Sequence, residues 1–230
     1  MNLRQGRVLR IGHRGAAALA PENTLASIET AIDLGVDLVE IDVVEDEGRL
    51  RLAHETSSLT PDNPLLADAL ELMAARGTGV LLDLKSTGVE REVVSLLREH
   101  GLVDDSVVAS FHAGSLRAVK DADPTVTTGF SYPFDRARLS TRRAFQPFVG
   151  VGLAGLRRVL PARVGPMLSR ARADAALLEW RVISPPVVER CHERGVAVLA
   201  WTVEDDAGLQ RVLAAGVDGV IANDPRLFGD

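Results

Sequence analysis

Short apolar runs alternate with amphipathic stretches along almost the whole chain. The apolar runs are typical of buried strands, and between them apolar residues recur every three or four positions, which is typical of helices. Eight apolar runs can be counted, in the regions of Val8, Leu38, Val80, Val107, Val126, Ala175, Val196 and Val217. Strands that alternate with helices form a parallel sheet, and eight of them can close it into a barrel. The pattern therefore predicts the α/β class and a (β/α)8 TIM barrel in one domain, 1–230.

The predicted elements follow one another closely. Strands are expected at 7–12, 37–43, 80–84, 107–110, 126–130, 175–178, 197–203 and 219–221. A first helix should begin after a cap at Asn23 or Thr24 and end near residue 34. Further helices are expected at 66–75, 89–100, 114–121, 185–194 and 206–215. A turn at 47–48 should lead into an extra strand at 50–53 that presents His54.

Length and composition fit this fold. The chain has 230 residues, of which 46% are hydrophobic, so it can build a large core. A single cysteine, Cys191, excludes an intramolecular disulfide framework and fits a reducing cytosol. The first residues lack the apolar core of a signal peptide, and no apolar run reaches the roughly 18 residues of a spanning helix. A formal charge of −6 argues against general nucleic-acid binding. These features predict a cytoplasmic protein without a nucleic-acid partner.

Three acidic residues stand where predicted strands end. Glu40 and Asp42 share one face of their strand because side chains alternate with period two, and Asp83 ends the next strand of the barrel. An edge strand with its acids in water would have the same pattern, but the preceding amphipathic helix favours a buried parallel strand. Like charges about 4 Å apart repel by ~4 kcal/mol at an effective dielectric of 20. The three acids therefore predict either a bound cation or carboxyls that hold protons. Ligands that are all oxygens favour Mg²⁺ or Ca²⁺.

Several short motifs, taken in order, resemble a known family. They are H-R-G at 13–15, P-E-N-T at 21–24, E-x-D at 40–42, His54, A-W-T-V at 200–203, G-V-D-G-V-I at 216–221 and D-P at 224–225. Each motif is weak alone, but the ordered set spans nearly the whole chain and resembles the glycerophosphodiester phosphodiesterase family of the PLC-like phosphodiesterase TIM-barrel superfamily. The resemblance implies a phosphoric diester hydrolase of lipid metabolism.

The resemblance also implies roles for single residues. It carries a metal-binding role onto Glu40 and Asp42, with one divalent cation, Mg²⁺ or Ca²⁺, as cofactor. It implies that His13 and His54 are the catalytic acid and base, which fits a side chain that titrates near neutral pH. Which histidine is the acid stays open, whereas His100, His112 and His192 are expected to be structural.

Three further residues are expected to contact the substrate. Arg14 and Lys85 would bind the phosphodiester oxygens and offset charge in the transition state. Alternatively, Arg14 forms an ion pair with Glu40 or Asp42, a role that can coexist with substrate binding. Trp201 would form an apolar wall against the glycerol moiety or simply fill a layer of the barrel.

The chain departs from the family pattern near the second histidine. Asp83 stands where the family usually has Glu, so direct ligation by this shorter side chain is open, and an ion pair with Lys85 is the alternative. Glu55 follows His54 where the family usually has Asp. The short stretch between His54 and Asp83 leaves little room for the insertion that shapes the substrate pocket in many relatives. The expected protein is a compact form of the family without that insertion.

The segment 136–172 has an unusual charge. It holds nine arginines and no Asp, Glu or Lys, although the chain as a whole is acidic. Apolar residues lie between the arginines, so the segment is predicted to be a basic amphipathic insertion that contacts an anionic membrane. The alternative is an elaborated loop whose apolar residues pack on the barrel. The predicted location is therefore cytoplasmic, with peripheral membrane contact through 136–172 as an open question.

The predicted function is metal-dependent hydrolysis of a small-molecule glycerophosphodiester, or of a lysophospholipid, to an alcohol and glycerol phosphate by His/His acid–base catalysis. A phospholipase D-type lipid enzyme of the same superfamily is a second interpretation. A third is a catalytically weak lipid-binding barrel, because Asp83 and the missing insertion depart from the family.

Overall fold

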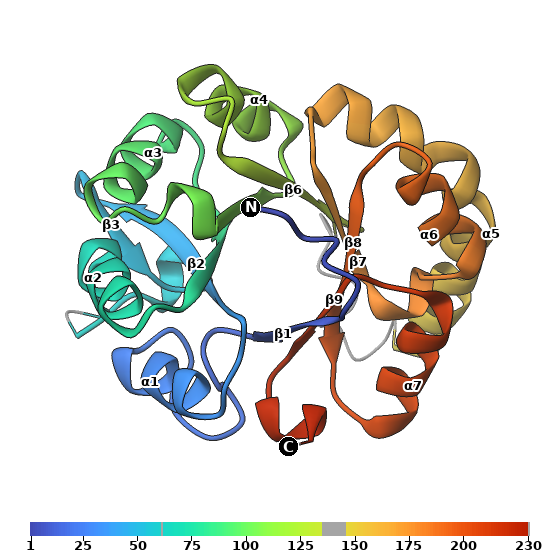
Figure 1. Ribbon diagram of the computed structural model, residues 1–230, viewed down its shortest axis with the longest axis horizontal. Coiled ribbons are helices and arrows are strands. Elements are labelled where there is room, and N and C mark those ends of the chain that lie inside the picture. The colour runs from blue at the N-terminus through green and yellow to red at the C-terminus, as the bar shows by residue number, and fades with distance from the viewer. Residues whose placement is uncertain (61, 135–145, 230) are drawn as a thin grey trace.

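The computed structural model describes residues 1–60, 62–134 and 146–229, and eight parallel strands in it close into a barrel (Figure 1). The barrel strands are β1 (Leu9–Gly12), β2 (Leu38–Asp46), β4 (Gly79–Leu84), β5 (Ser106–Ser110), β6 (Thr127–Tyr132), β7 (Ala175–Glu179), β8 (Ala197–Val203) and β9 (Gly219–Ala222). Closure follows from β1, which pairs in parallel with both β2 and β9. The predicted (β/α)8 TIM barrel is confirmed.

Helices lie between the strands and surround the barrel (Figure 1). They are α1 (Leu25–Asp33), α2 (Leu66–Arg76), α3 (Glu90–Glu99), α4 (Ala113–Ala122), α5 (Gln146–Ala171), α6 (Pro185–His192) and α7 (Asp206–Ala215). Short 3-10 helices are η1 (Thr56–Ser58), η2 (Val103–Asp105), η3 (Trp180–Val182) and η4 (Pro225–Phe228). No helix within the described ranges is long and apolar enough to cross a membrane.

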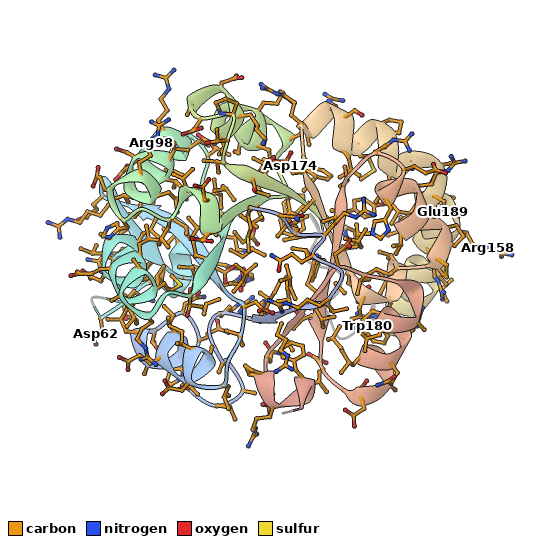
Figure 2. All side chains as sticks on the ribbon, in the orientation of Figure 1. Asp62, Arg98, Arg158, Asp174, Trp180 and Glu189 are labelled. Atoms are coloured by element: carbon orange, nitrogen blue, oxygen red, sulfur yellow. The ribbon has the colours of Figure 1, made fainter. Side chains whose placement is uncertain are left out.

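The alternation of β2 works as the sequence predicts. Val39, Ile41 and Val43 are fully buried in a cluster that also holds residues of α1 and α2, so they form the layer between sheet and helices. Leu38, on the opposite face, packs with Leu9 in a separate buried cluster. Side chains fill the interior of the barrel (Figure 2). Glu40 and Asp42 share this inward face, and the strand therefore delivers two carboxylates to the mouth of the barrel.

The second strand is longer than predicted. It runs on to Asp46 because β3 (Arg49–Leu52) pairs with its end in antiparallel register, from Val43↔Leu52 to Asp46↔Arg49. This hairpin stands at the C-terminal end of the barrel, and the chain leaves it directly into His54. The hairpin thus brings to the mouth a histidine that no barrel strand carries.

Residues 146–171 of the basic segment form α5, which lies between β6 and β7 in the chain. α5 has 26 residues, and Leu160, Val164 and Leu168 are buried in the cluster shared with α6 and β8. Pro161 and Pro166 lie within the helix. Of the predicted segment 136–172, residues 136–145 lie outside the described ranges. Much of the apolar surface of α5 thus serves the barrel core.

Candidate active site

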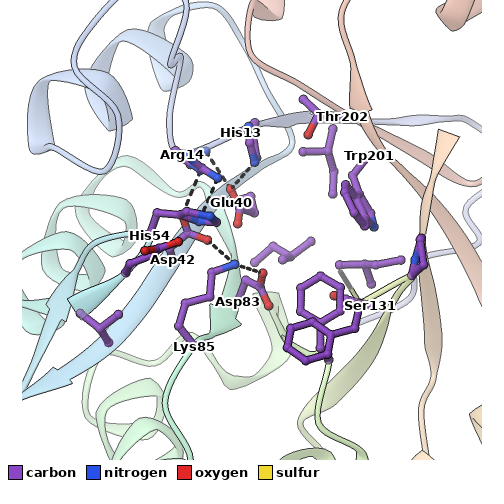
Figure 3. A pocket seen from close by; sticks show the side chains of 18 of the residues that line it. His13, Arg14, Glu40, Asp42, His54, Asp83, Lys85, Ser131, Trp201 and Thr202 are labelled. Atoms are coloured by element: carbon purple, nitrogen blue, oxygen red, sulfur yellow. Dashed lines mark hydrogen bonds and ion pairs between the residues drawn. The ribbon is translucent and has the colours of Figure 1, made fainter. Parts of the chain in front are cut away.

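A cavity of about 800 Å³ opens at the C-terminal ends of the barrel strands (Figure 3). Its lining includes every site residue that the sequence analysis names: His13, Arg14, Glu40, Asp42, His54, Asp83, Lys85 and Trp201. These residues come from positions 13 to 201 of the chain, and only closure of the barrel brings them together. Their grouping is what a barrel active site requires, while their individual chemical roles remain predictions.

Three buried carboxylates form the centre of the site. Glu40, Asp42 and Asp83 each offer an oxygen, and these oxygens lie within 4.8 Å of one another. The parallel register of β2 and β4 sets Asp42 directly beside Asp83. All three are less than 9% exposed, and Asp83 Oδ1 is buried without a hydrogen-bond partner. An unpaired buried carboxylate oxygen is costly, so the site fits a cation that would satisfy it.

The carboxylates are not equally easy to ionise. Burial raises the pKa of Glu40 well above its usual range, and the charges of Asp42 and Asp83 raise it further. Burial also raises the pKa of Asp83. Burial acts in the same direction on Asp42, but the His54 hydrogen bond and the charges of Lys85 and Arg14 hold its pKa well below the usual range. A divalent cation would allow all three to ionise together.

Two basic side chains neutralise part of this charge. Lys85 Nζ lies 2.8 Å from Asp42 Oδ1 and 2.5 Å from Asp83 Oδ2. Arg14 Nε lies 2.9 Å from Asp42 Oδ2. The alternative of an Asp83–Lys85 pair is therefore realised, but the pair is mostly buried and lines the cavity instead of lying on the surface. The predicted Arg14 ion pair is present with Asp42.

The loop after β1 aims Arg14 through an unusual backbone. Arg14 has a φ of +50°, and its N–H donates to Glu40 Oε2 at 2.8 Å. Gly15 follows with a φ of +85°, and a Cβ there would meet Ser27 at 2.4 Å. Only glycine fits so close to α1, which explains the third residue of the H-R-G motif.

His13 has one ring nitrogen engaged and one facing the site. Its Nδ1 lies 2.6 Å from Asn223 Oδ1, and its Nε2 lies 3.9 Å from Glu40 Oε2. Burial lowers the pKa of His13 to about 4, and the charge of Arg14 acts in the same direction. Before any cation binds, this imidazole is neutral near pH 7.

His54 faces the same carboxylates from the β3 side. Its Nδ1 lies 3.2 Å from Asp42 Oδ2 and 2.9 Å from an Arg14 guanidinium nitrogen. Its side chain is 42% exposed, so it stands at the rim where solvent and substrate can reach it. His13 is therefore nearest to Glu40, whereas His54 contacts Asp42.

Aromatic side chains line the opposite wall of the cavity. Phe111 packs edge-on against Trp201 with ring centroids 6.1 Å apart, and Phe134 lies 5.1 Å from Phe111. Trp201 also packs against the cluster inside the barrel. Both predicted roles of Trp201, pocket wall and barrel filler, thus match its position.

Sequence reasoning missed two asparagines. Asn23 is 1% exposed, its Nδ2 donates to Asp42 Oδ2, and its Oδ1 accepts from the Asp42 N–H, both at 3.0 Å. The cap of α1 is Thr24, whose hydroxyl accepts from the N–H of Ser27. The P-E-N-T motif pointed to Asn23, but only as a cap. Asn223, which contacts His13, stands one residue before the D-P motif, and nothing in that motif marked it.

Comparison with known proteins gives consistent matches. A glycerophosphodiester phosphodiesterase from Caldanaerobacter subterraneus subsp. tengcongensis is 27% identical to this chain over 258 residues. The alignment covers 95% of this chain and 95% of that protein. An Oleispira antarctica phosphodiesterase, solved in complex with the product sn-glycerol-3-phosphate, has a TM-score of 0.71 at 23% identity, with 94% of this chain and 93% of that chain covered. The Agrobacterium tumefaciens glycerophosphodiester phosphodiesterase has a TM-score of 0.72 at 22% identity, with coverage of 96% and 99%.

The family profile covers most of the chain. It matches residues 13–45 and 74–227 and leaves out 46–73, the stretch with β3 and His54. This gap falls in the region that the sequence analysis identified as atypical. The predicted enzyme class, a phosphoric diester hydrolase, is confirmed at the level of the family. The chain belongs to the glycerophosphoryl diester phosphodiesterase family.

Proposed function

We propose that this enzyme hydrolyses glycerophosphodiesters to an alcohol and glycerol phosphate with the help of one divalent cation. The observation that carries the proposal is the meeting of three buried carboxylates, two histidines and two basic side chains in one cavity. Each group matches a need of phosphodiester hydrolysis, namely metal binding, proton transfer and anion binding.

Glu40, Asp42 and Asp83 would hold the cation. Oxygen-only ligands favour Mg²⁺ or Ca²⁺, and the partnerless Asp83 Oδ1 supports direct ligation by Asp83. When bound, the cation would offset negative charge on the phosphodiester oxygens. It would also offset the burial and the repulsion from Asp42 and Asp83 that hold the pKa of Glu40 high.

Arg14 and Lys85 would bind the phosphodiester itself. Both reach the cavity, and both are already fixed by ion pairs to Asp42, so little side-chain entropy is lost when substrate arrives. Lys85 keeps its charge because the nearby carboxylates of Asp83 and Asp42 raise its pKa, although burial lowers it.

His13 and His54 would carry the protons. One takes a proton from the glycerol hydroxyl of the substrate or from water, and the other gives a proton to the alkoxide oxygen that leaves. Each histidine lies beside a different carboxylate of the cavity, His13 beside Glu40 and His54 beside Asp42, which supports a division of the two proton transfers between them.

Hydrolysis assays test the proposed function against its alternatives. Purified protein is incubated with glycerophosphocholine and with lysophosphatidylcholine, each in EDTA, Mg²⁺ or Ca²⁺. Release of glycerol phosphate from the water-soluble diester, only with a divalent ion, supports the proposal. Activity confined to the lysolipid favours the phospholipase D-type enzyme. Failure to hydrolyse either substrate with any ion favours the lipid-binding barrel and overturns the proposal.

We also propose that α5 brings the enzyme to anionic membranes. α5 has 26 residues, about 39 Å at 1.5 Å per residue, and it holds no acidic side chain. The other α-helices in the described ranges have 8 to 11 residues, so α5 has turns that the barrel wall does not require. Val151 is 72% exposed, and Arg158 extends outward (Figure 2).

Vesicle sedimentation tests the membrane proposal. Binding to phosphatidylglycerol vesicles at low salt and release at high salt are expected, since attraction to arginine is electrostatic and screened. Arg158→Glu should weaken binding, while Arg91→Glu on α3, also exposed, makes the same charge change and serves as the control. If both variants weaken vesicle binding equally, the binding depends only on the net charge of the protein, which contradicts a role for α5.

A further inference from the structure

His13 and Asn223 are neighbours at the point where the barrel closes. His13 is the first residue after β1, and Asn223 is the first after β9. The two strands pair in parallel with Gly12 beside Ala222, and the His13 N–H donates to the Ala222 carbonyl at 2.9 Å. The first and last strands thus deliver these two side chains to the same edge.

The contact between them selects one form of the imidazole. Asn223 Oδ1 lies 2.6 Å from His13 Nδ1, and an amide oxygen can only accept a hydrogen bond. The proton of the neutral ring is then on Nδ1, which leaves a lone pair on Nε2. Nε2 lies beyond hydrogen-bond distance from Glu40 Oε2, at 3.9 Å, and His13 lines the cavity.

Asn223 is itself held in place from several sides. Its carbonyl accepts from the Ala18 N–H at 3.0 Å. The next residue, Asp224, caps η4 through the Arg226 N–H at 3.0 Å and also binds the Arg226 guanidinium. Among the described residues, those that line the cavity do not include Asn223. Its amide is therefore fixed behind His13 without reaching the substrate.

We propose that Asn223 is a positioning residue that holds His13 with Nδ1–H toward the amide and a bare Nε2 toward the substrate. In this form His13 is ready to accept a proton, which makes it the base and leaves the acid role to His54. The proposal rests on the proposed phosphodiesterase function. It assigns a role to a residue that does not line the cavity and whose amide oxygen contacts His13.

Substitutions at Asn223 separate positioning from simple structure. Asn223→Leu keeps the size and removes the acceptor, and kcat should fall about 100-fold, the cost of misplacing a catalytic group by about 1 Å. KM should change less than about threefold, because transition-state interactions are lost while substrate contacts are kept. Asn223→Asp retains an oxygen acceptor and has no donor, so kcat should stay within about tenfold of wild type. Loss of activity in the Asp variant equal to that in the Leu variant would overturn the proposal.

Nitrogen NMR of the imidazoles provides a second measurement. The chain has five histidines, so ¹⁵N-histidine labelling gives a simple spectrum. In the wild type the protonated nitrogen of His13 should be Nδ1, and in Asn223→Leu the proton should shift toward Nε2, the form that free imidazoles prefer. An unchanged His13 tautomer in a folded Leu variant would also overturn the proposal. The signal of His192, held by Asp218 at 2.8 Å, should not change.

A matched control lies at the other end of β9. Asp218 precedes β9 as Asn223 follows it, and it also contacts a histidine, but at the N-terminal end of the barrel. Asp218→Asn should leave kcat unchanged even if it lowers stability, whereas a loss like that of Asn223→Leu would point to a general effect of β9. Should the wild-type protein hydrolyse no phosphodiester, the proposed function fails, while the NMR measurement still tests the tautomer.

Discussion

Asn23 and Asp42 bind each other through two hydrogen bonds of 3.0 Å, one from the Asn23 amide to the Asp42 carboxylate and one from the Asp42 N–H to the Asn23 oxygen. Asn23 has a φ of +56°, a left-handed conformation that asparagine tolerates better than most residues. The loop before α1 therefore fixes the orientation of a carboxylate on β2. The contact therefore orients Asp42, one of the proposed metal ligands.

Removing this support should weaken cation binding. Asn23→Ala leaves Asp42 Oδ2 with fewer partners, and the affinity for Mg²⁺ or Ca²⁺ should fall about 10- to 100-fold, as for other outer partners of metal ligands. Isothermal titration of the metal-free protein measures this. Asn63→Ala is the control, because Asn63 also makes several hydrogen bonds but in the loop after β3. Equal cation affinity in Asn23→Ala and wild type would show that Asn23 does not support cation binding.

The barrel and most of its cavity could be predicted because they follow from local patterns. The alternation of Glu40 and Asp42 with Val39, Ile41 and Val43 fixes which face points inward. The alternation of strands and helices predicts a barrel, and in a barrel the C-terminal ends of the strands meet at one end. Motifs at strand ends were therefore enough to find the cavity.

The two asparagines could not be predicted for different reasons. Asn23 precedes a helix, where its side chain could equally cap the helix or turn toward a strand, and only the packed structure decides. Asn223 lies 210 positions from His13, and their contact exists only because the first and last strands pair. α5 escaped prediction because Pro161 and Pro166 interrupt the pattern of a continuous helix.

Asp83→Glu should tighten cation binding. Asp83 Oδ1 lacks a partner, and the longer side chain can reach further into the cluster with Glu40 and Asp42. The divalent-ion concentration at half-maximal activity should fall, while Asp83→Asn, which removes the charge at equal size, should raise it. A higher ion requirement in the Glu variant would indicate that the site is built around the shorter acid.

His13→Ala and His54→Ala should each lower kcat at least ~100-fold, the low end for general acid–base catalysis. A substrate with a good leaving group needs no acid, so an aryl phosphodiester should restore activity to the variant that lacks the acid. If His54 is the acid, only His54→Ala is rescued. Rescue of His13→Ala instead would reverse the assignment. Cation binding should persist in both variants.

Cys191 should resist thiol reagents in the folded protein. It is fully buried, and burial raises the pKa of its thiol to about 12, so almost no reactive thiolate forms near pH 8. Reaction with Ellman's reagent should be slow in buffer. In denaturant it should quickly release one equivalent of thionitrobenzoate per chain, because the chain has one cysteine. Fast reaction in buffer would mean that α6 opens readily.

Ionisation of Glu40 should lower the stability of the metal-free protein as the pH rises above the usual range of a glutamate. The lowered pKa of His13 acts in the opposite direction, so the contribution of Glu40 is measured as the difference between the wild type and a Glu40 variant. The pKa of Glu40 is raised in the folded state, mainly by burial and then by Asp42 and Asp83. Below the unfolded pKa the carboxyl is protonated in both states, and its full contribution is present. As the pH rises, the unfolded chain releases its proton first, so the free energy of unfolding falls until the folded pKa is passed.

Urea unfolding in EDTA across this pH range measures the effect. Glu40→Gln cannot ionise, so its free energy of unfolding should fall less with pH than that of the wild type. Some slope should remain, because the pKa of Asp83 is also raised. Glu189→Gln, on the exposed side of α6, is the control and should follow the wild type. Added Mg²⁺ or Ca²⁺ should restore the stability that the wild type loses at high pH, because the cation stabilises the three ionised carboxylates. It should not stabilise Glu40→Gln in the same way, because this variant lacks one of the three. Parallel curves for wild type and Glu40→Gln in EDTA would mean that Glu40 is ionised without a cation, and that Lys85 and Arg14 suffice to neutralise the site.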